Sequence, residues 1–197
     1  MKHLVVATRN KGKIIEIEAL LDGLVDQISS AADFRDFPET VEDGATFEEN
    51  ALKKAREAAL FTGLPVLADD SGLVVDSLAG RPGVYSARFA GEGAGDAANN
   101  ERLLEECLEV PEDQRHAAFV CVLAYVTPEG CEQLFTGNVS GRILTVAQGE
   151  GGFGYDPLFL VDGFGRSMAE LTLGEKNMVS HRAQAFMKFR EYLAAIA

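Results

Sequence analysis

The chain has 197 residues, and its 47% hydrophobic and 25% charged residues are ordinary for a soluble globular protein. A formal net charge of −13 disfavours a nucleic-acid polymer as partner, because proteins that bind one present a basic surface. The apolar runs at residues 4–7 and 117–126 are too short for a signal-peptide core and a membrane span, so we expect a cytoplasmic protein with no membrane partner.

The first half of the chain is predicted to mix helices and short strands. Apolar residues at helical spacing predict a helix after the polar segment 8–13, and the capping-box spacing of Thr46 and Glu49 predicts another, which Gly63 ends. In chain order, we expect a strand, a helix, a strand, a helix and two strands over residues 3–7, 14–24, 25–29, 46–63, 65–68 and 73–78.

The second half is predicted to contain a hairpin between two helices. The apolar run rich in Val and Phe is typical of a strand that is buried on both faces, and Cys121 within it is expected to be a small buried hydrophobe. Asp96 is the expected cap of the first helix, and Ser180 that of the last. The elements are a helix to Leu108, strands over residues 117–127, 132–138 and 158–161, and a C-terminal amphipathic helix.

These elements predict an α/β fold with a mixed sheet, because hairpins need antiparallel strand pairs. A chain of this length buries about 70% of its unfolded surface, so one domain over residues 1–197 needs no disulfide or structural metal. The three cysteines (Cys107, Cys121 and Cys131) are odd in number and have no paired metal-ligand spacing.

Residues 67–72 are the most informative stretch, because they place Asp69, Asp70 and Ser71 between an apolar strand and a glycine. We expect the strand to end there, with one carboxylate entering a cleft and the other bracing the turn. An aspartate at that edge suits a divalent metal on phosphate oxygens, whereas the alternative is an Asx-turn after the strand.

The polar segment 8–13 has the setting of an anion site. A strand enters it, a helix leaves it, and backbone N–H groups with the helix dipole therefore face one spot. Thr8 and Asn10 add neutral groups and Lys13 adds a charge, although the spacing is not that of a Walker A motif. Solvated surface lysines are the alternative interpretation.

Two later segments could bind a base. Residues 153–156 combine an aromatic side chain, a glycine and a carboxylate in one turn, and aromatic faces stack on nucleobases. The alternative is a turn whose aromatic rings fill the core. Residues 180–182, with Lys176 before them, place His181 and Arg182 at a helix start as donors to keto or phosphate oxygens; the alternative is a capping turn with a solvated His181 ring.

Taken together, these segments resemble the inosine/xanthosine triphosphate pyrophosphatase family, which acts on deaminated purine nucleotides. The resemblance covers nearly the whole chain and follows six segments in order: residues 8–13, 46–51, 68–73, 81–88, 153–157 and 180–182. It implies a two-lobed α/β fold around a central mixed sheet with flanking helices and an active-site cleft between the lobes. It also implies a homodimer and Mg²⁺-dependent cleavage of a nucleoside triphosphate to the monophosphate and pyrophosphate.

The resemblance further implies roles for individual residues. Asp70 takes the position of the catalytic carboxylate and metal ligand. The substrate-binding positions are Thr8, Arg9, Asn10, Lys11, Gly12, Lys13, Ser71, Phe153, Gly154, Tyr155, Asp156, Lys176, His181 and Arg182. Where relatives often carry a further carboxylate, this chain has Val41, so either Glu42 takes over as second metal ligand or water does.

These features predict an enzyme that hydrolyses ITP, dITP and XTP. Donors facing O6 of the purine would reject adenine, whose amino group is itself a donor. Two other functions are compatible with parts of the pattern: a nucleotide-binding sensor without turnover, and a septum-inhibitor-type pyrophosphatase acting on modified nucleotides. Asp70 disfavours the sensor, and residues 153–156 and 180–182 disfavour the other pyrophosphatase.

Overall fold

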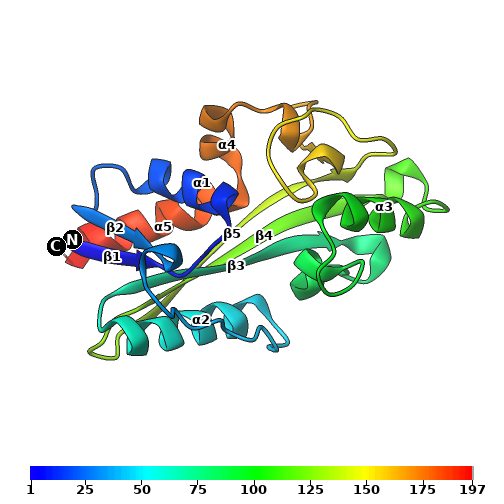
Figure 1. The fold of residues 1–197 in the computed structure, drawn as a ribbon. Helices are drawn as coiled ribbons and strands as arrows, with labels where there is room; N and C mark the ends of the chain where they lie inside the picture. The colour runs from blue at the N-terminus through cyan, green and yellow to red at the C-terminus, as the bar shows by residue number, and fades with distance from the viewer. Residues whose placement is uncertain (197) are drawn as a thin grey trace. The chain divides into compact units, whose positions relative to one another are not determined.

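The structure is a computed structural model that describes residues 1–196. Within them, one mixed sheet has the strand order β2-β1-β3-β4-β5-β6 (Figure 1). β1 pairs in parallel with β2 and β3, whereas β5 and β6 are antiparallel. The strands are β1 His3–Val6, β2 Gln27–Ser30, β3 Val66–Val75, β4 His116–Val126, β5 Glu132–Ile143 and β6 Phe159–Val161. The predicted α/β class with a mixed sheet is confirmed.

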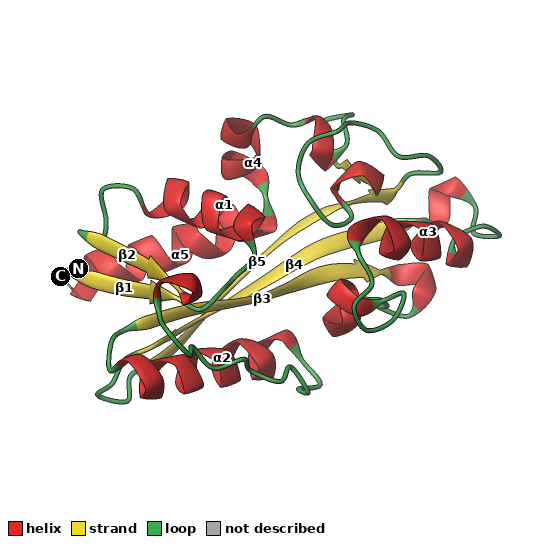
Figure 2. Cartoon of the chain, in the orientation of Figure 1, coloured by secondary structure: helices red, strands yellow, loops and turns green. Residues whose placement is uncertain are grey.

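Helices flank this sheet (Figure 2). The α-helices are α1 Lys11–Leu21, α2 Phe47–Thr62, α3 Asp96–Glu106, α4 Leu173–Val179 and α5 His181–Ile196. Thr46 caps α2 by accepting a hydrogen bond from the Glu49 N–H, as predicted, and α2 ends at Gly63, whose φ is 66°. None of the helices in this part of the chain combines the length and the apolar character that a membrane crossing requires.

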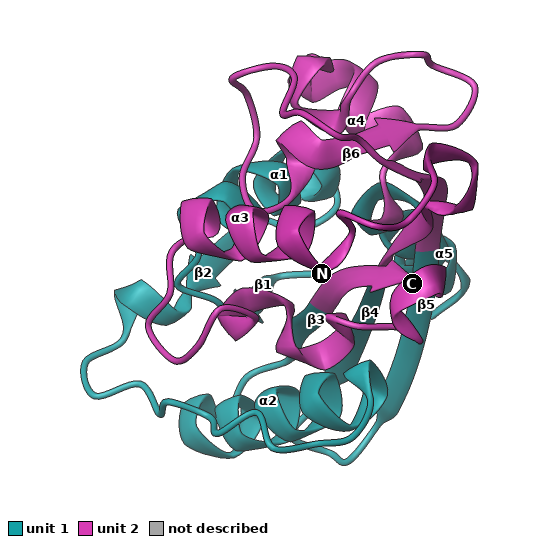
Figure 3. Cartoon of the chain, turned by 90° about the vertical axis from the view of Figure 1, so that its right-hand side faces the viewer, with its two compact units in different colours: residues 1–70, 121–137, 182–197 teal, residues 71–120, 138–181 magenta. Residues whose placement is uncertain are grey.

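The chain divides into two compact units, coloured separately in Figure 3. Unit 1 comprises residues 1–70, 121–137 and those from 182 on, and unit 2 comprises residues 71–120 and 138–181. Strands β3, β4 and β5 contribute residues to both units.

Unit 1 covers the two faces of its strands with different helices. Along β1, β3 and β4, alternate side chains pack with residues of α1 and α5 on one side and of α2 on the other. Leu67 faces α1 and α5, whereas Val66 and Ala68 face the alanine stripe of α2. Neighbouring residues of one such strand therefore point to opposite faces of the sheet.

Unit 2 has its own apolar core. Leu73 and Val75 of β3 and Phe119 of β4 pack with Phe159 of β6, and Tyr155 is buried among them. The Phe119 and Phe159 rings have centroids 4.5 Å apart.

The structure corrects several predicted boundaries. Residues 69–72 form no turn, because β3 runs without interruption through Asp69, Asp70 and Ser71 to Val75. Helix α4 was not predicted; Ser180 is its C-cap and directly precedes α5, where it was expected as the cap. Gly95 is the N-cap of α3, so Asp96 is the first residue of that helix instead of its cap.

Candidate active site

Asp69 and Asp70 point to opposite faces of β3, because both lie inside a continuous strand. Asp69 lies on the same face of β3 as Leu67 and contacts residues of α1 and α5. Asp70 lies on the same face as Ala68 and meets α2. The sequence motif therefore supplies two separate charge clusters in unit 1, one on each side of the sheet.

The first cluster is a buried chain of alternating charges. Lys13 Nζ lies 2.7 Å from Asp69 Oδ2, and Arg182 Nη2 lies 3.4 Å from the same oxygen. Arg182 Nη1 donates to Glu16, whose side chain is also buried. Burial alone would raise the pKa of Asp69, but Lys13 and Arg182 hold it well below its ordinary value. The contacts of Asp69 thus fix the side chains of Lys13 and Arg182.

The second cluster surrounds Asp70. Asn50 Nδ2 donates to Asp70 Oδ2 at 3.0 Å, and Lys54 Nζ lies 3.8 Å from Asp70 Oδ1. The same ammonium donates to Glu42 Oε1 at 2.8 Å. Burial raises the pKa of Asp70 and Glu42 adds to the rise, whereas Lys54 and Asn50 act in the opposite direction. Two carboxylates, Asp70 and Glu42, thus share the ammonium group of Lys54.

This second cluster fits a magnesium ion chemically. Mg²⁺ prefers oxygen ligands and binds through one or two protein carboxylates together with substrate phosphates and water. Asp70 and Glu42, which contact the same ammonium, supply that number of carboxylates. Within residues 1–196 no group of three or more His, Cys, Asp or Glu side chains could hold a metal ion. Substrate phosphates and water would therefore have to supply the remaining ligands.

The segment 8–13 leads from β1 into α1. Asn10 caps α1 by accepting a hydrogen bond from the Lys13 N–H at 3.1 Å, and Thr8 Oγ1 accepts one from the Asn10 N–H. Arg9 donates to the Phe37 carbonyl at 3.0 Å, which ties the loop to the segment before α2. Lys11 and Gly12 form the first turn of the helix, where backbone N–H groups have no acceptor within the helix.

Unit 2 holds the second predicted group. Asp156 Oδ2 accepts from the Phe153 N–H at 3.1 Å and from Lys176 Nζ at 2.8 Å. The Lys176 ammonium also lies 5.4 Å from the centre of the Phe153 ring. Lys176 and Asp156 are both buried. The structure thus brings together an aromatic ring, a carboxylate and an ammonium, and the assignment of this group as a base site stays a prediction.

The remaining predicted residues of unit 2 have different surroundings. Tyr155 is buried in the core, and its hydroxyl donates to the Ser86 carbonyl at 2.8 Å. The His181 ring stacks on Phe119, with centroids 5.0 Å apart and an angle of 17° between the planes. Ser71 lies in β3, directly after Asp70.

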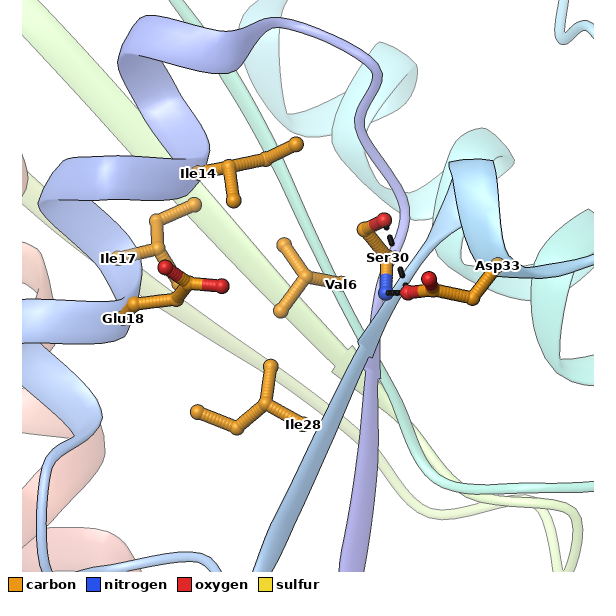
Figure 4. A pocket seen from close by; sticks show the side chains of 7 residues that line it. All are labelled: Val6, Ile14, Ile17, Glu18, Ile28, Ser30 and Asp33. Atoms are coloured by element: carbon orange, nitrogen blue, oxygen red, sulfur yellow. Dashed lines mark hydrogen bonds between the residues drawn. The ribbon is translucent and has the colours of Figure 1, made fainter.

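A cavity in unit 1 is lined by no residue of either charge cluster. Its volume is about 150 Å³, and Ile14 and Ile17 of α1 face Val6 and Ile28 across it (Figure 4). Ser30 and Asp33 at its side are hydrogen-bonded to each other. None of the predicted site residues lines this cavity.

Sequence reasoning missed three residues of the charge clusters. Asn50 and Lys54 are four residues apart on α2 and therefore share one helix face, next to its buried alanine stripe. Two polar residues four positions apart, next to the buried alanines of the same helix, were the sequence signal that could have indicated this contact with the sheet. Glu16 similarly follows Lys13 by three residues, next to the buried Ile17.

Comparison with known proteins gives a consistent result. A family model described as the Ham1 family matches residues 4–192. A dITP/XTP pyrophosphatase of Geobacter sulfurreducens is 58% identical over 193 residues, which cover 98% of this chain and 97% of that protein. The protein of the same name from Exiguobacterium sibiricum is 50% identical over 190 residues, 96% of either chain.

Solved structures agree with these relatives. A HAM1 protein from Coxiella burnetii matches with a TM-score of 0.89 and 39% identity, over 99% of this chain and 100% of the other. A nucleoside-triphosphatase, or dITP/XTP pyrophosphatase, from Mycobacterium abscessus matches with a TM-score of 0.78 and 46% identity, over 96% and 98% of the two chains.

Proposed function

This chain belongs to the Ham1 family, and we propose that it hydrolyses ITP, dITP and XTP to the nucleoside monophosphate and pyrophosphate. Relatives named dITP/XTP pyrophosphatase support this substrate class. The observation that carries the chemistry is the cluster of unit 1 in which Asp70 lies among Asn50, Lys54 and Glu42. A binding protein without turnover has no need of a carboxylate with these neighbours.

The triphosphate is proposed to bind to unit 1. The N–H groups at the start of α1 and its dipole favour an anion, and Lys13 adds a positive charge held in place by Asp69. Most of the catalytic effect should come from such fixed charges, as in phosphoryl transfer generally. Among the other predicted substrate-binding residues, Thr8, Arg9, Asn10, Lys11, Gly12 and Ser71 keep that role as a proposal.

Asp70 is the proposed catalytic residue for attack of water at the α-phosphorus. Its carboxylate would orient the water, while Asn50 fixes the carboxylate through the hydrogen bond to Oδ2. Asp70 and Glu42 would hold Mg²⁺, which when bound neutralises negative charge on the phosphate oxygens. Lys54 would offset the repulsion between the two carboxylates and hold them in place.

The base is proposed to bind to unit 2. Phe153 offers a ring for stacking, and Gly154, Tyr155, Asp156 and Lys176 fix the shape and charge around it. Donors from Lys176 and His181 would meet O6 of the purine, where adenine has an amino group. A donor facing a donor leaves both unpaired, which is costly in a buried site. Arg182, which belongs to unit 1, keeps its predicted role in binding substrate as a proposal.

The assembly and setting of the enzyme are part of the same proposal. Residues 1–197 would act as one nucleoside triphosphate pyrophosphatase domain, and the enzyme would be a cytoplasmic homodimer. Light scattering on a size-exclusion column should give twice the mass of one chain. A monomer with full activity would remove the dimer from the proposal.

The identity of the products tests the reaction. With ITP and Mg²⁺, we expect IMP and pyrophosphate in equal amounts, because the reacting atom is the α-phosphorus. Anion-exchange chromatography of the products, with and without added inorganic pyrophosphatase, measures this directly. IDP and orthophosphate would show attack at the γ-phosphorus and would contradict the proposal.

Replacing Glu42 tests the second metal ligand. Glu42→Gln should raise the Mg²⁺ concentration at half-maximal rate about 10-fold, because the site loses one of its two carboxylates. Asp43→Asn is the matched control, since Asp43 is the exposed neighbour paired with Lys53 at 2.6 Å. An unchanged Mg²⁺ curve for Glu42→Gln would leave Asp70 and water as the ligands.

A further inference from the structure

Two residues in the first turns of α3 form hydrogen bonds to Gly154, which follows Phe153 in the same turn. Asp96 Oδ2 accepts a hydrogen bond from the Gly154 N–H at 2.7 Å. Asn100 Nδ2 donates to the Gly154 carbonyl at 2.9 Å. Asp96 and Asn100 are four residues apart and therefore lie on one face of α3. Both peptide groups flanking the Gly154 Cα are thus bound by one helix face.

Gly154 needs such support because of its backbone conformation. Its φ is 61°, in the left-handed region, while a Cβ at this position would meet nothing within 4 Å. The glycine is therefore required by the dihedral angle and not by lack of space. Two hydrogen bonds to its flanking peptides select this conformation from the many that a glycine can adopt.

The arrangement around Asn100 indicates that its donor group is what matters. Asn100 Oδ1 is buried and has no hydrogen-bond partner within residues 1–196. An unpaired buried amide oxygen is unfavourable. The amide nitrogen nevertheless reaches the Gly154 carbonyl.

Helix α3 is itself fixed within unit 2. Asn99 accepts from the Ala90 N–H at 2.8 Å and donates to the Ala87 carbonyl at 3.2 Å. The Arg102 guanidinium also lies 5.5 Å from the centre of the Phe89 ring. These contacts fix the position of α3, so that Asp96 and Asn100 can hold the Gly154 turn in one conformation.

We propose that Asp96 and Asn100 are positioning residues that set the affinity for the purine base by holding the Gly154 turn and, through it, the Phe153 ring. This inference rests on the proposed function. Neither residue has to touch the substrate. Without them, the turn samples other conformations, and base binding has to restore the productive one.

Steady-state kinetics of variants test the inference. Asp96→Ala should raise KM for ITP about 10-fold and Asn100→Ala about 5-fold, with kcat within about 3-fold of wild type. Asp96→Asn should restore most of the affinity, because an amide oxygen can still accept from the Gly154 N–H. Glu101→Ala, an exposed change on the same helix, is the control and should leave both constants unchanged.

Inorganic tripolyphosphate, which has no base, separates positioning from general damage. Its inhibition constant should stay within 2-fold of wild type in both alanine variants. A wild-type KM for ITP in the alanine variants would overturn the positioning role. An equal rise in the KM for ITP and in the inhibition constant of tripolyphosphate would do the same, and neither result would affect the proposed function. A wild-type protein that does not cleave ITP would overturn the proposed function and this inference with it.

Discussion

Asp70→Asn should lower kcat for ITP by about 10²–10³-fold while KM changes less than about 5-fold. The amide keeps the shape of the side chain but removes the charge that serves the water and the metal, and loss of one preorganised electrostatic group has effects of this size. Asn50 donates to Asp70 Oδ2, and the new amide oxygen can accept the same hydrogen bond. Turnover with saturating Mg²⁺ and direct binding of ITP measure the two effects.

Two comparisons make this result specific. Asp76→Asn changes an exposed aspartate directly after the same strand and should leave kcat unchanged. The melting temperature of Asp70→Asn should show that the protein is folded. Turnover near the wild-type value in Asp70→Asn would move the catalytic role to Asp69 or Glu42.

Arg182→Met should destabilise the protein by about 3–5 kcal/mol. The change removes the cation that lies between Glu16 and Asp69, and a buried charge that loses its partner costs about this much. For a chain of this length, the melting temperature should fall by roughly 10 °C. Thermal or urea unfolding followed by circular dichroism measures the loss.

A second position on α5 provides the control for Arg182. Arg190 is exposed, and Arg190→Met should change stability by no more than about 0.5 kcal/mol. Equal melting temperatures for Arg182→Met and Arg190→Met would contradict the importance assigned to the buried charge chain. The effect of Arg182 on choice of base stays a separate prediction, read from the ratio of kcat/KM for ITP and ATP.

Local patterns in the sequence predicted most of the elements of this fold. Capping and helical spacing located α2 and its ends at Thr46 and Gly63. A continuous apolar run located β4, and Cys121 is fully buried within it, as expected. These features depend on neighbouring residues only, so the sequence reports them directly.

The continuity of β3 was not predictable in the same way. Asp69, Asp70, Ser71 and Gly72 have the composition of a turn, yet they lie within one strand. The partners that stabilise the two carboxylates come from α1, α2 and α5, far away in sequence. Tertiary ion pairs thus override the local preference for a turn.

The candidate site shows the same division. Sequence motifs singled out Lys13, Asp70 and the Phe153 turn as candidates, because each is a short segment with typical chemistry. Lys54 was not identified, since a lysine on a helix is usually solvated and only the fold places its ammonium between Asp70 and Glu42. Where residues from separate elements meet, the sequence alone could not supply the contact.

The proposed selectivity of the enzyme for deaminated purine triphosphates is tested by measuring kcat/KM for a panel of nucleotides. With saturating Mg²⁺, pyrophosphate release should give values for ITP, dITP and XTP at least about 100-fold above that for ATP, because a mismatched donor in a buried site costs this much or more. GTP, CTP and TTP should also be cleaved far more slowly than the deaminated purine nucleotides. Equal values for ATP and ITP would contradict the claim.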